Sequence, residues 1–388
     1  MTPISATAVR ALAVLAWMAA HACAQEGSIA SGSAGVRNKQ FFIAQESEGA
    51  RLNIGGYLQF RYHLNWRDDD AGGNDFTNGF MARRSRVQLS GQIMENWTFN
   101  VMTELSPSGA GTLLDGFIGH RLESGWVLQF GQFKMPLLRE ELVSDAILLA
   151  AERSPTNSVF SQSRSLGVQA SRESEDWRGA IAIHNGMNTL NTRFDAASAA
   201  DFAVTGRLDH KLAGAWSQFR DFTSWRGSDF AAMIGAAGHY QTGGETGNTT
   251  DLDFAQYTLD LSLEGDGWNA FAAFIGRHSD TASGSFDDFG VVVQGGVFVS
   301  DAVELWGRYD IVIADDDRPG VTHDFGTITA GLNWYVIPES HAVVVKVQAM
   351  WYLDAQAGSL VGTSTGSGLL ASPNDDQFSI FAQIGMIF

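Results

Sequence analysis

Residues 52–66 read LNIGGYLQFRYHLNW, a stretch in which apolar and polar side chains alternate. Its even positions carry Leu58 and Phe60, and its odd positions carry Gln59 and Arg61. Successive side chains of a β-strand point to opposite faces, so this stretch predicts a strand with one apolar and one polar face. The same alternation returns at 343–353 and at 378–388, where the sequence ends on Phe388.

About sixteen segments with this alternation follow one another from residue 52 onward. They are centred near residues 59, 86, 101, 118, 130, 168, 181, 206, 235, 258, 272, 294, 308, 331, 347 and 383. Short connections alternate with long ones, which include 67–79, 135–164, 185–200, 241–251, 278–288, 314–324 and 354–377. Short turns at one rim and long loops at the other are typical of outer-membrane barrels. We therefore predict an all-β fold, a transmembrane antiparallel up-and-down β-barrel of about 16 strands.

Alternation alone also fits a soluble β-sandwich, which buries one face of each strand in the same way. Four tryptophans, Trp97, Trp126, Trp177 and Trp268, directly follow short turns, where indole rings suit the lipid headgroup boundary. The terminal Phe388 matches the pattern that barrel assembly machinery reads. These features favour the membrane barrel. One connection, 211–228, is long where a short turn is expected, so the strand register near 205–240 stays open.

The N-terminal residues predict export. Arg10 precedes an apolar stretch at 11–20, and small residues surround Cys23 before Gln25. We predict a signal peptide at 1–24, a short N-terminal segment at 25–50 and the barrel domain at 51–388. A lipoprotein acylation site at Cys23 is the alternative. Once this leader is removed, the chain has no cysteine, which excludes disulfides and thiolate metal sites.

The charge balance excludes further classes of protein. The chain has 25 basic and 43 acidic residues and a net charge of −18, which is unlike a nucleic-acid-binding protein. No apolar run after residue 20 is long enough for a membrane-spanning helix. The nine histidines show no metal-binding spacing, and we expect neither a metal nor a cofactor.

If the apolar face contacts lipid, the polar face lines the lumen, which water fills in a barrel of this size. The charges on that face are nearly balanced. The basic ones are Arg61, Arg84, Arg86, Arg207, Arg308 and Lys346, and the acidic ones are Glu104, Asp209, Asp260, Glu304 and Asp310. Arg84 and Arg86 share one face and repel each other unless an anion lies between them. Arg83 is expected to point the other way, near a rim.

The connection from 135 to 164 is too long for a plain hairpin and contains many apolar residues, so it should pack against something. It is the third long loop, and the third long loop of general porins folds into the lumen and narrows it. Its charged residues are therefore candidates for the pore constriction: Arg139, Arg153, Arg164, Glu140, Glu141, Asp145 and Glu152. A helix lying on the barrel exterior is the alternative.

Several motifs resemble one family of porins. They are GGYLQFRY at 55–62, RRSRVQLSG at 83–91, GQFKMP at 131–136, ERS at 152–154, RSLGVQ at 164–169 and the terminal IGMIF. In order and spacing they are similar to the phosphate-selective porin O and P family. The resemblance implies a sixteen-stranded barrel, usually a trimer, that passes anions through a basic lumen. The chain departs from that pattern in having only four lysines, Lys39, Lys134, Lys211 and Lys346.

We predict an outer-membrane porin that passes small hydrophilic solutes by diffusion and favours anions such as phosphate. The predicted pore-lining and anion-binding residues are Arg61, Arg84, Arg86, Lys134, Arg139, Arg153, Arg164, Arg207, Arg308 and Lys346. The expected partners are the solutes, the lipid bilayer with its lipopolysaccharide, the barrel assembly machinery and two further copies in a homotrimer. In a Gram-negative outer membrane, the long loops would be extracellular and both termini periplasmic.

Two alternatives remain beside this prediction. A general or sugar-passing porin would have the same fold without an anion preference. An outer-membrane barrel hydrolase would need a nucleophile, and residues 362–366, GTSTG, match the G-x-S-x-G spelling. That motif works only between a strand and a helix, whereas here it lies in a Gly, Ser and Thr-rich stretch, so we expect a loop and no enzyme.

Overall fold

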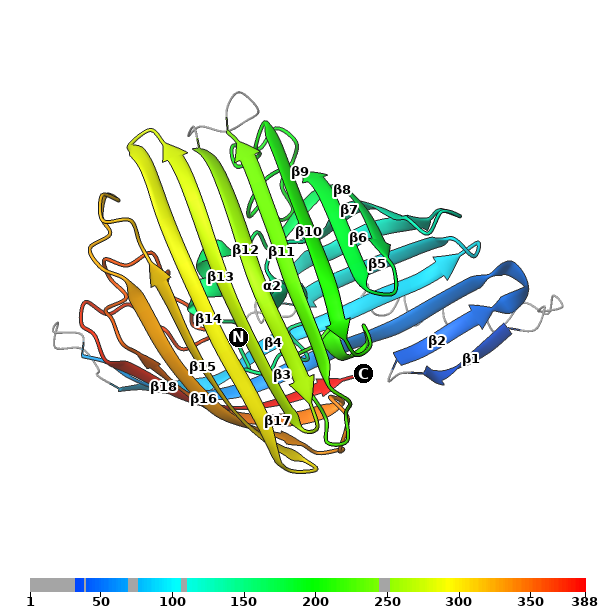
Figure 1. The fold of residues 1–388 in the computed structure, drawn as a ribbon. Coiled ribbons are helices and arrows are strands. Elements are labelled where there is room, and N and C mark those ends of the chain that lie inside the picture. The colour runs from blue at the N-terminus through cyan, green and yellow to red at the C-terminus, as the bar shows by residue number, and fades with distance from the viewer. Residues whose placement is uncertain (1–31, 38–39, 69–75, 106–109, 244–251) are drawn as a thin grey trace.

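The computed structural model describes residues 32–37, 40–68, 76–105, 110–243 and 252–388, so the signal peptide predicted at 1–24 lies outside the described residues. Sixteen antiparallel strands form a barrel (Figure 1). These are β3 (Ala50–Trp66), β4 (Phe76–Ile93), β5 (Trp97–Leu105), β6 (Gly111–Arg121), β7 (Val127–Lys134), β8 (Arg164–Glu173), β9 (Trp177–His184), β10 (Phe202–Ala213), β11 (Ala231–Thr242), β12 (Leu252–Gly265), β13 (Trp268–Thr281), β14 (Gly284–Ser300), β15 (Val303–Ile313), β16 (Phe325–Tyr335), β17 (Val343–Tyr352) and β18 (Gln377–Ile387). The predicted fold is confirmed.

The barrel closes between its first and last strands. β18 pairs antiparallel with β3 from Phe378 opposite Trp66 to Ile387 opposite Tyr57. Beyond that ladder, the backbone of Phe388 exchanges hydrogen bonds of 2.8 and 3.0 Å with Gly56. Every other barrel strand pairs with its neighbours in sequence, which is the up-and-down topology.

The two faces of the strands differ as the alternation predicts. Leu58 and Phe60 are 46% and 50% exposed, whereas Gln59 and Arg61 are buried on the lumen side. The four tryptophans that follow short turns, Trp97, Trp126, Trp177 and Trp268, are all exposed on the outside. The apolar exterior with its aromatic residues near the rim suits a lipid bilayer.

Two further strands precede the barrel. β1 (Gly32–Arg37) and β2 (Gln40–Gln45) form a hairpin, followed by the one-turn helix η1 (Glu46–Glu48). β2 pairs with the start of β3, where Phe41 lies opposite Ile54, beyond the last residue of β18. The hairpin therefore extends the sheet outside the closed barrel, and Figure 1 shows it projecting beside β3.

The prediction of one long loop is wrong. The connection predicted at 278–288 is a tight turn at 282–283, because β13 and β14 continue to Thr281 and Gly284. Their ladder runs unbroken from Trp268 opposite Val297 to the turn. The sequence interpretation assigned 278–288 to a loop, but backbone pairing continues to Thr281 opposite Gly284.

The connection with uncertain register folds inward. β10 and β11 pair continuously from Phe202 opposite Thr242 to Lys211 opposite Met233, which settles the register. The residues between these strands, 214–230, are named here the inner turn and include the short helix η2 (Gln218–Arg220). Phe219 and Phe222 of the inner turn are buried, so this segment packs inside the barrel at the short-turn rim.

The third long loop, residues 135–163 and called L3 here, lies within the barrel. It contains two short helices, α2 (Arg139–Leu142) and α3 (Pro155–Phe160). Its Leu137 and Phe160 are fully buried in a cluster with wall residues of β11, β13 and β15 to β18. The inward fold is confirmed, and a helix on the barrel exterior is excluded.

The GTSTG stretch belongs to the last long loop, residues 353–376, called L8 here. No helix follows it, and its Ser364 forms an isolated bridge with Leu369. The geometry is not that of a nucleophile elbow. Among the described residues, no helix combines the length and the apolar character required to cross a membrane.

Candidate pore constriction

The basic side of the constriction comes from two neighbouring strands. Arg61 of β3 and Arg84 and Arg86 of β4 all point into the lumen and are buried. β3 and β4 are long paired strands, and alternation places these three side chains on the same inner face.

Arg83 also points inward, contrary to the sequence prediction. Its guanidinium Nε lies 2.7 Å from Glu152 Oε1. The reason is a β-bulge, since Gln59 lies opposite Arg84 while the next residue, Phe60, lies opposite Ala82. A bulge leaves one residue unpaired and redirects its side chain, so the two-residue period fails at Arg83.

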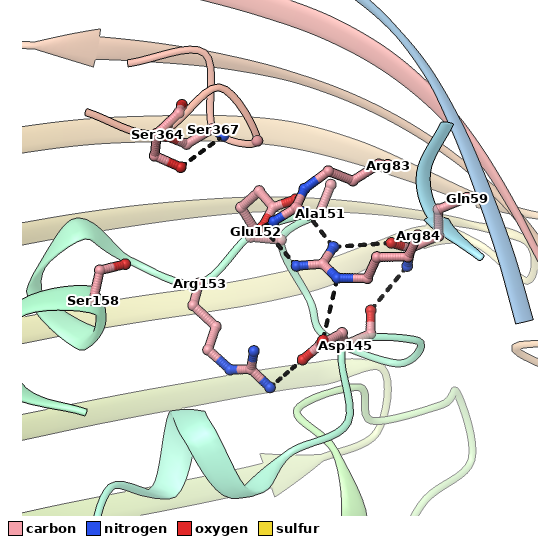
Figure 2. A network of polar contacts seen from close by, with 12 residues as sticks. Gln59, Arg83, Arg84, Asp145, Ala151, Glu152, Arg153, Ser158, Ser364 and Ser367 are labelled. Atoms are coloured by element: carbon pink, nitrogen blue, oxygen red, sulfur yellow. Dashed lines mark hydrogen bonds and ion pairs between the residues drawn. The ribbon is translucent and has the colours of Figure 1, made fainter. Parts of the chain in front are cut away.

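Glu152 of L3 binds three of these arginines. Its carboxylate oxygens lie 2.8 Å from Arg61 Nη2, 2.7 Å from Arg83 Nε and 2.8 Å from Arg84 Nη2. Figure 2 shows Arg83 and Arg84 converging on Glu152 from the wall, with L3 holding the carboxylate between them. This residue fastens L3 to β3 and β4.

Asp145 of L3 lies between Arg84 and Arg86. Its Oδ2 is 3.2 Å from Arg84 Nε and 2.6 Å from Arg86 Nη1, and its Oδ1 contacts Arg153 from within L3 (Figure 2 shows the pairs with Arg84 and Arg153). The sequence places Arg84 and Arg86 on the same face and predicts an anion between them. The structure shows that this anion is the carboxylate of Asp145.

Both L3 carboxyls are strongly acidic. Burial by itself would raise the pKa of Asp145, but the guanidiniums of Arg153, Arg84 and Arg86 hold that pKa well below its ordinary value. Burial opposes ionisation of Glu152 in the same way, and its three arginines likewise lower its pKa. Both side chains are therefore charged at neutral pH.

The remaining predicted arginines of the strands are also paired. Arg164 lies 2.8 Å from Asp115, Arg207 lies 2.8 Å from Asp260, and Arg308 lies 3.3 Å from Glu140. The other three predicted cations bind backbone carbonyls. Lys134 Nζ donates to Glu141 O at 2.6 Å, Arg139 donates to Phe219 O at 2.6 Å, and Lys346 donates to carbonyls at 148–150.

Two cavities lie on either side of this network. The larger, of about 880 Å³, opens toward the short-turn rim and is named the inner vestibule. The smaller, of about 300 Å³, lies toward the long loops and is named the outer aperture. Asp145 lines the first, while its partners Arg84 and Arg153 line the second. The ion pairs of Asp145 therefore separate the two cavities.

The charged residues of the inner vestibule are mostly basic. Nine are cationic, namely Arg86, Arg121, Lys134, Arg139, Arg164, Arg172, Arg178, Arg207 and Arg220. Four are anionic, namely Asp115, Asp145, Glu173 and Asp209. Of these cations, only four form ion pairs with carboxylates among the described residues, namely Arg86, Arg164, Arg178 and Arg207. The vestibule thus has a clear excess of positive charge.

The predicted site residues divide into three groups. Arg86, Lys134, Arg139, Arg164 and Arg207 line the inner vestibule, Arg84 and Arg153 line the outer aperture, and Arg61, Arg308 and Lys346 line neither. Those three support L3 from the wall. The sequence prediction omitted four basic residues of the vestibule, Arg121, Arg172, Arg178 and Arg220. Arg121 could have been found, because it lies an even number of residues after Asp115 in β6 and alternation places both side chains on the same face.

Comparison with known families agrees with this geometry. The model of the family described as phosphate-selective porin O and P matches residues 54–279, which run from within β3 through β4 and L3 to within β13. The chain belongs to this family. It is therefore a porin of the Gram-negative outer membrane, a channel for small solutes and not an enzyme. The hydrolase alternative is excluded.

Solved structures with the same fold are known. OmpT of Vibrio cholerae is 13% identical, with 89% of this chain and 99% of that chain covered and a TM-score of 0.61. An anion-selective porin from Comamonas acidovorans is 11% identical, with 87% of this chain and 100% of that chain covered and a TM-score of 0.62. OmpF of Salmonella typhi, in complex with daunomycin, is 12% identical, with 88% of this chain and 99% of that chain covered and a TM-score of 0.58. No curated protein matches the chain by sequence.

Proposed function

We propose that this porin conducts small anions, phosphate among them, in preference to cations. The observation that carries the proposal is the inner vestibule, whose lining has nine basic and four acidic residues. A cavity lined by one sign of charge raises the local concentration of the opposite ion. Family membership supports the same preference.

The net charge of −18 does not oppose this proposal. At physiological ionic strength, charges farther than about 8 Å from a permeating ion are largely screened. Exposed acidic residues of the loops, such as Asp316, therefore influence the ion less than the guanidiniums that line its path. The local wall determines the sign of the selectivity.

The preference should be weak to moderate, without a tight phosphate site. Arg84, Arg86 and Arg153 at the constriction already bind carboxylates of the chain, so a passing anion competes with Asp145 and Glu152 for them. Adding millimolar phosphate to a chloride solution should therefore cause no saturable block of the single-channel current.

The test is the reversal potential of single channels in a planar bilayer under a potassium chloride gradient. The unmodified porin should favour chloride, and the double variant Arg172→Gln and Arg220→Gln should move the potential toward cations. Arg193→Gln is the control for loss of a basic side chain elsewhere, because Arg193 is exposed on the loop after β9 and does not line the vestibule. A cation preference of the unmodified porin, or equal shifts in variant and control, would exclude the proposal, and absent selectivity would favour the general porin.

We also infer a homotrimer. A trimer form of OmpT from Vibrio cholerae is among the structures with the same fold, at 13% identity and a TM-score of 0.58. Native mass spectrometry of the detergent-extracted porin should give three copies per particle. A monomer under mild detergent conditions would contradict the inference.

A further inference from the structure

L8 lies partly inside the barrel as well. Its residues 366–369 are buried, and Val361 and Leu369 are only 2% and 1% exposed. A solvated surface loop would leave such apolar side chains exposed. The Gly, Ser and Thr-rich stretch of L8 is therefore an ordered part of the pore interior.

Hydrogen bonds hold the tip of L8 to the barrel wall. Asn65 Nδ2 donates to Gly368 O at 2.7 Å, and Tyr352 Oη donates to Ser367 O at 2.9 Å. Gln377 bonds Leu370 twice, as acceptor from the backbone N–H at 2.7 Å and as donor to the carbonyl at 2.9 Å. Arg61, which also binds Glu152 of L3, donates to Gly366 O.

L8 also packs against L3. Val361 and Leu369 of L8 belong to the same buried cluster as Leu137 and Phe160 of L3. At Gly366 the backbone lies so close to the wall that a Cβ atom there would be 2.5 Å from Arg83 Nε. The two loops therefore form one packed body that is attached to β3, β4 and β18.

The outer aperture is the space that this body leaves open. L3 contributes Glu152, Arg153 and Ser158 to its lining, L8 contributes Ser364 and Ser367, and the wall contributes Arg83 and Arg84 (Figure 2 shows these side chains). L3 and β4 therefore supply the acidic and basic side chains of the aperture lining, and L8 supplies serine hydroxyls.

We propose that the tip of L8, residues 364–369, is a second constriction element that sets the size limit and conductance of the pore together with L3. Solutes on the long-loop side pass between the Ser364 and Ser367 edge of L8 and the Arg153 and Ser158 side of L3. The narrowest lining groups of a pore control its conductance. This inference depends on porin function but not on the proposed anion preference.

Cysteine substitution tests the position of L8. The only cysteine of the chain is Cys23, which lies in the predicted signal peptide, so Ser364→Cys introduces a single thiol into the exported porin at the aperture. Attachment of a small thiosulfonate reagent there should lower single-channel conductance by about half. Thr363→Cys is the matched control, since Thr363 is the exposed neighbour that does not line the aperture. If the thiol at 364 reacts poorly, Ser364→Trp against Thr363→Trp makes the same comparison without a reagent.

Releasing the anchors should have the opposite effect. The double variant Asn65→Ala and Gln377→Ala removes three side-chain hydrogen bonds to L8 and should raise conductance and admit larger uncharged polyethylene glycols into the pore. Asn78→Ala is the control, because Asn78 is exposed and, within the part of the chain that the structure describes, its side chain bonds only Tyr62 of the neighbouring strand. Equal effects at 363 and 364, together with an unchanged polymer cutoff in the anchor variant, would overturn the proposal. Because the polymers are uncharged, these outcomes do not depend on the ion preference.

Discussion

Asp145 connects the two sides of the constriction at the scale of a single residue. Its carboxylate contacts Arg84 and Arg86 of the wall and Arg153 of L3. Removing one member of a buried ion pair is costly when it leaves the other charge uncompensated. Here each arginine keeps a second carboxylate, since Arg84 binds Glu152, Arg86 binds Glu104 and Arg153 binds Glu141. Asp145 can therefore be neutralised without leaving a bare buried charge.

The variant Asp145→Asn should make the pore more selective for anions. It removes one negative charge where the two cavities meet, so the anion to cation permeability ratio should rise about twofold. The reversal potential under a salt gradient measures this ratio. Asp195→Asn is the control with the same charge change, on an exposed loop residue. An unchanged ratio in Asp145→Asn would mean that ions do not pass this carboxylate.

Replacing Arg84 and Arg86 together by Gln should shift the selectivity in the opposite direction. Asp145 would keep only Arg153, and Glu152 would keep Arg61 and Arg83. The constriction loses two positive charges, so the reversal potential should move toward cations. If the potential stays constant in this variant while heat-modifiable barrels still form, these arginines lie outside the conduction path.

At the scale of elements, L3 is held by packing and by polar contacts at α3. Ser154 caps α3 by accepting a hydrogen bond from Asn157 N at 2.9 Å. Thr156 donates from both its backbone N–H and its hydroxyl to Asp310 Oδ2, at 3.1 and 3.0 Å. Phe160, at the end of α3, is fully buried against the wall. The short helix therefore depends on the barrel for its stability.

The variant Phe160→Ala should loosen L3 while the barrel still assembles. Loss of a buried phenylalanine side chain lowers stability by about 3–5 kcal/mol. Because Phe160 belongs to L3, this loss destabilises the packing of the loop and not the strand ladder. Single-channel recordings should show larger and noisier currents. Phe194→Ala is the matched control, because Phe194 is 81% exposed. Quiet currents of normal size in Phe160→Ala would show that L3 does not depend on this contact.

L3 should resist mild acid. Asp145 and Glu152 have pKa values below their ordinary range, so the stability that they contribute is present at neutral pH and is lost only as the pH falls through the lowered pKa values. The ion pairs of Asp145 should persist from about pH 7 to about pH 4 and break only in stronger acid. The difference in conductance and noise between the unmodified porin and Asp145→Asn should therefore stay constant over this range. A difference that already disappears near pH 5 would contradict the assignment.

At the scale of the whole molecule, one seam between β3 and β18 closes the sheet. It joins the first barrel strand to the last residues of the chain, and the Phe388 backbone bonds Gly56 at its end. A closed barrel leaves no unpaired edge among its own strands, as lipid surroundings require. The hairpin of β1 and β2 continues the edge of β3 below this seam.

Deleting Phe388 should reduce assembly. The variant loses both backbone hydrogen bonds to Gly56 and the aromatic residue at the end of the last strand. The amount of folded, heat-modifiable porin in the outer membrane should fall several-fold, whereas the conservative Phe388→Tyr should retain it. Normal amounts of the deletion variant would mean that the seam closes without this residue.

Much of the fold could be predicted from local sequence. The predicted centre of every barrel strand lies inside an observed strand, and the lumen positions of Arg61, Arg84 and Arg86 follow from alternation. A strand repeats every two residues, so a short window of sequence contains this information. The apolar residues of 135–164 likewise indicated a loop that must pack inside.

Only the tertiary structure decided how the site is built. The bulge that turns Arg83 inward depends on the register with β3, and the inward positions of the inner turn and L8 depend on contacts with distant segments. Asp145 and Arg86 are 59 residues apart, and Arg61 and Gly366 are 305 residues apart. The sequence by itself determined which strand residues face the lumen wherever the two-residue period is unbroken, because that period is local. Which carboxylate neutralises which arginine depends on barrel closure and loop packing, and these bring together residues that no short stretch of sequence contains.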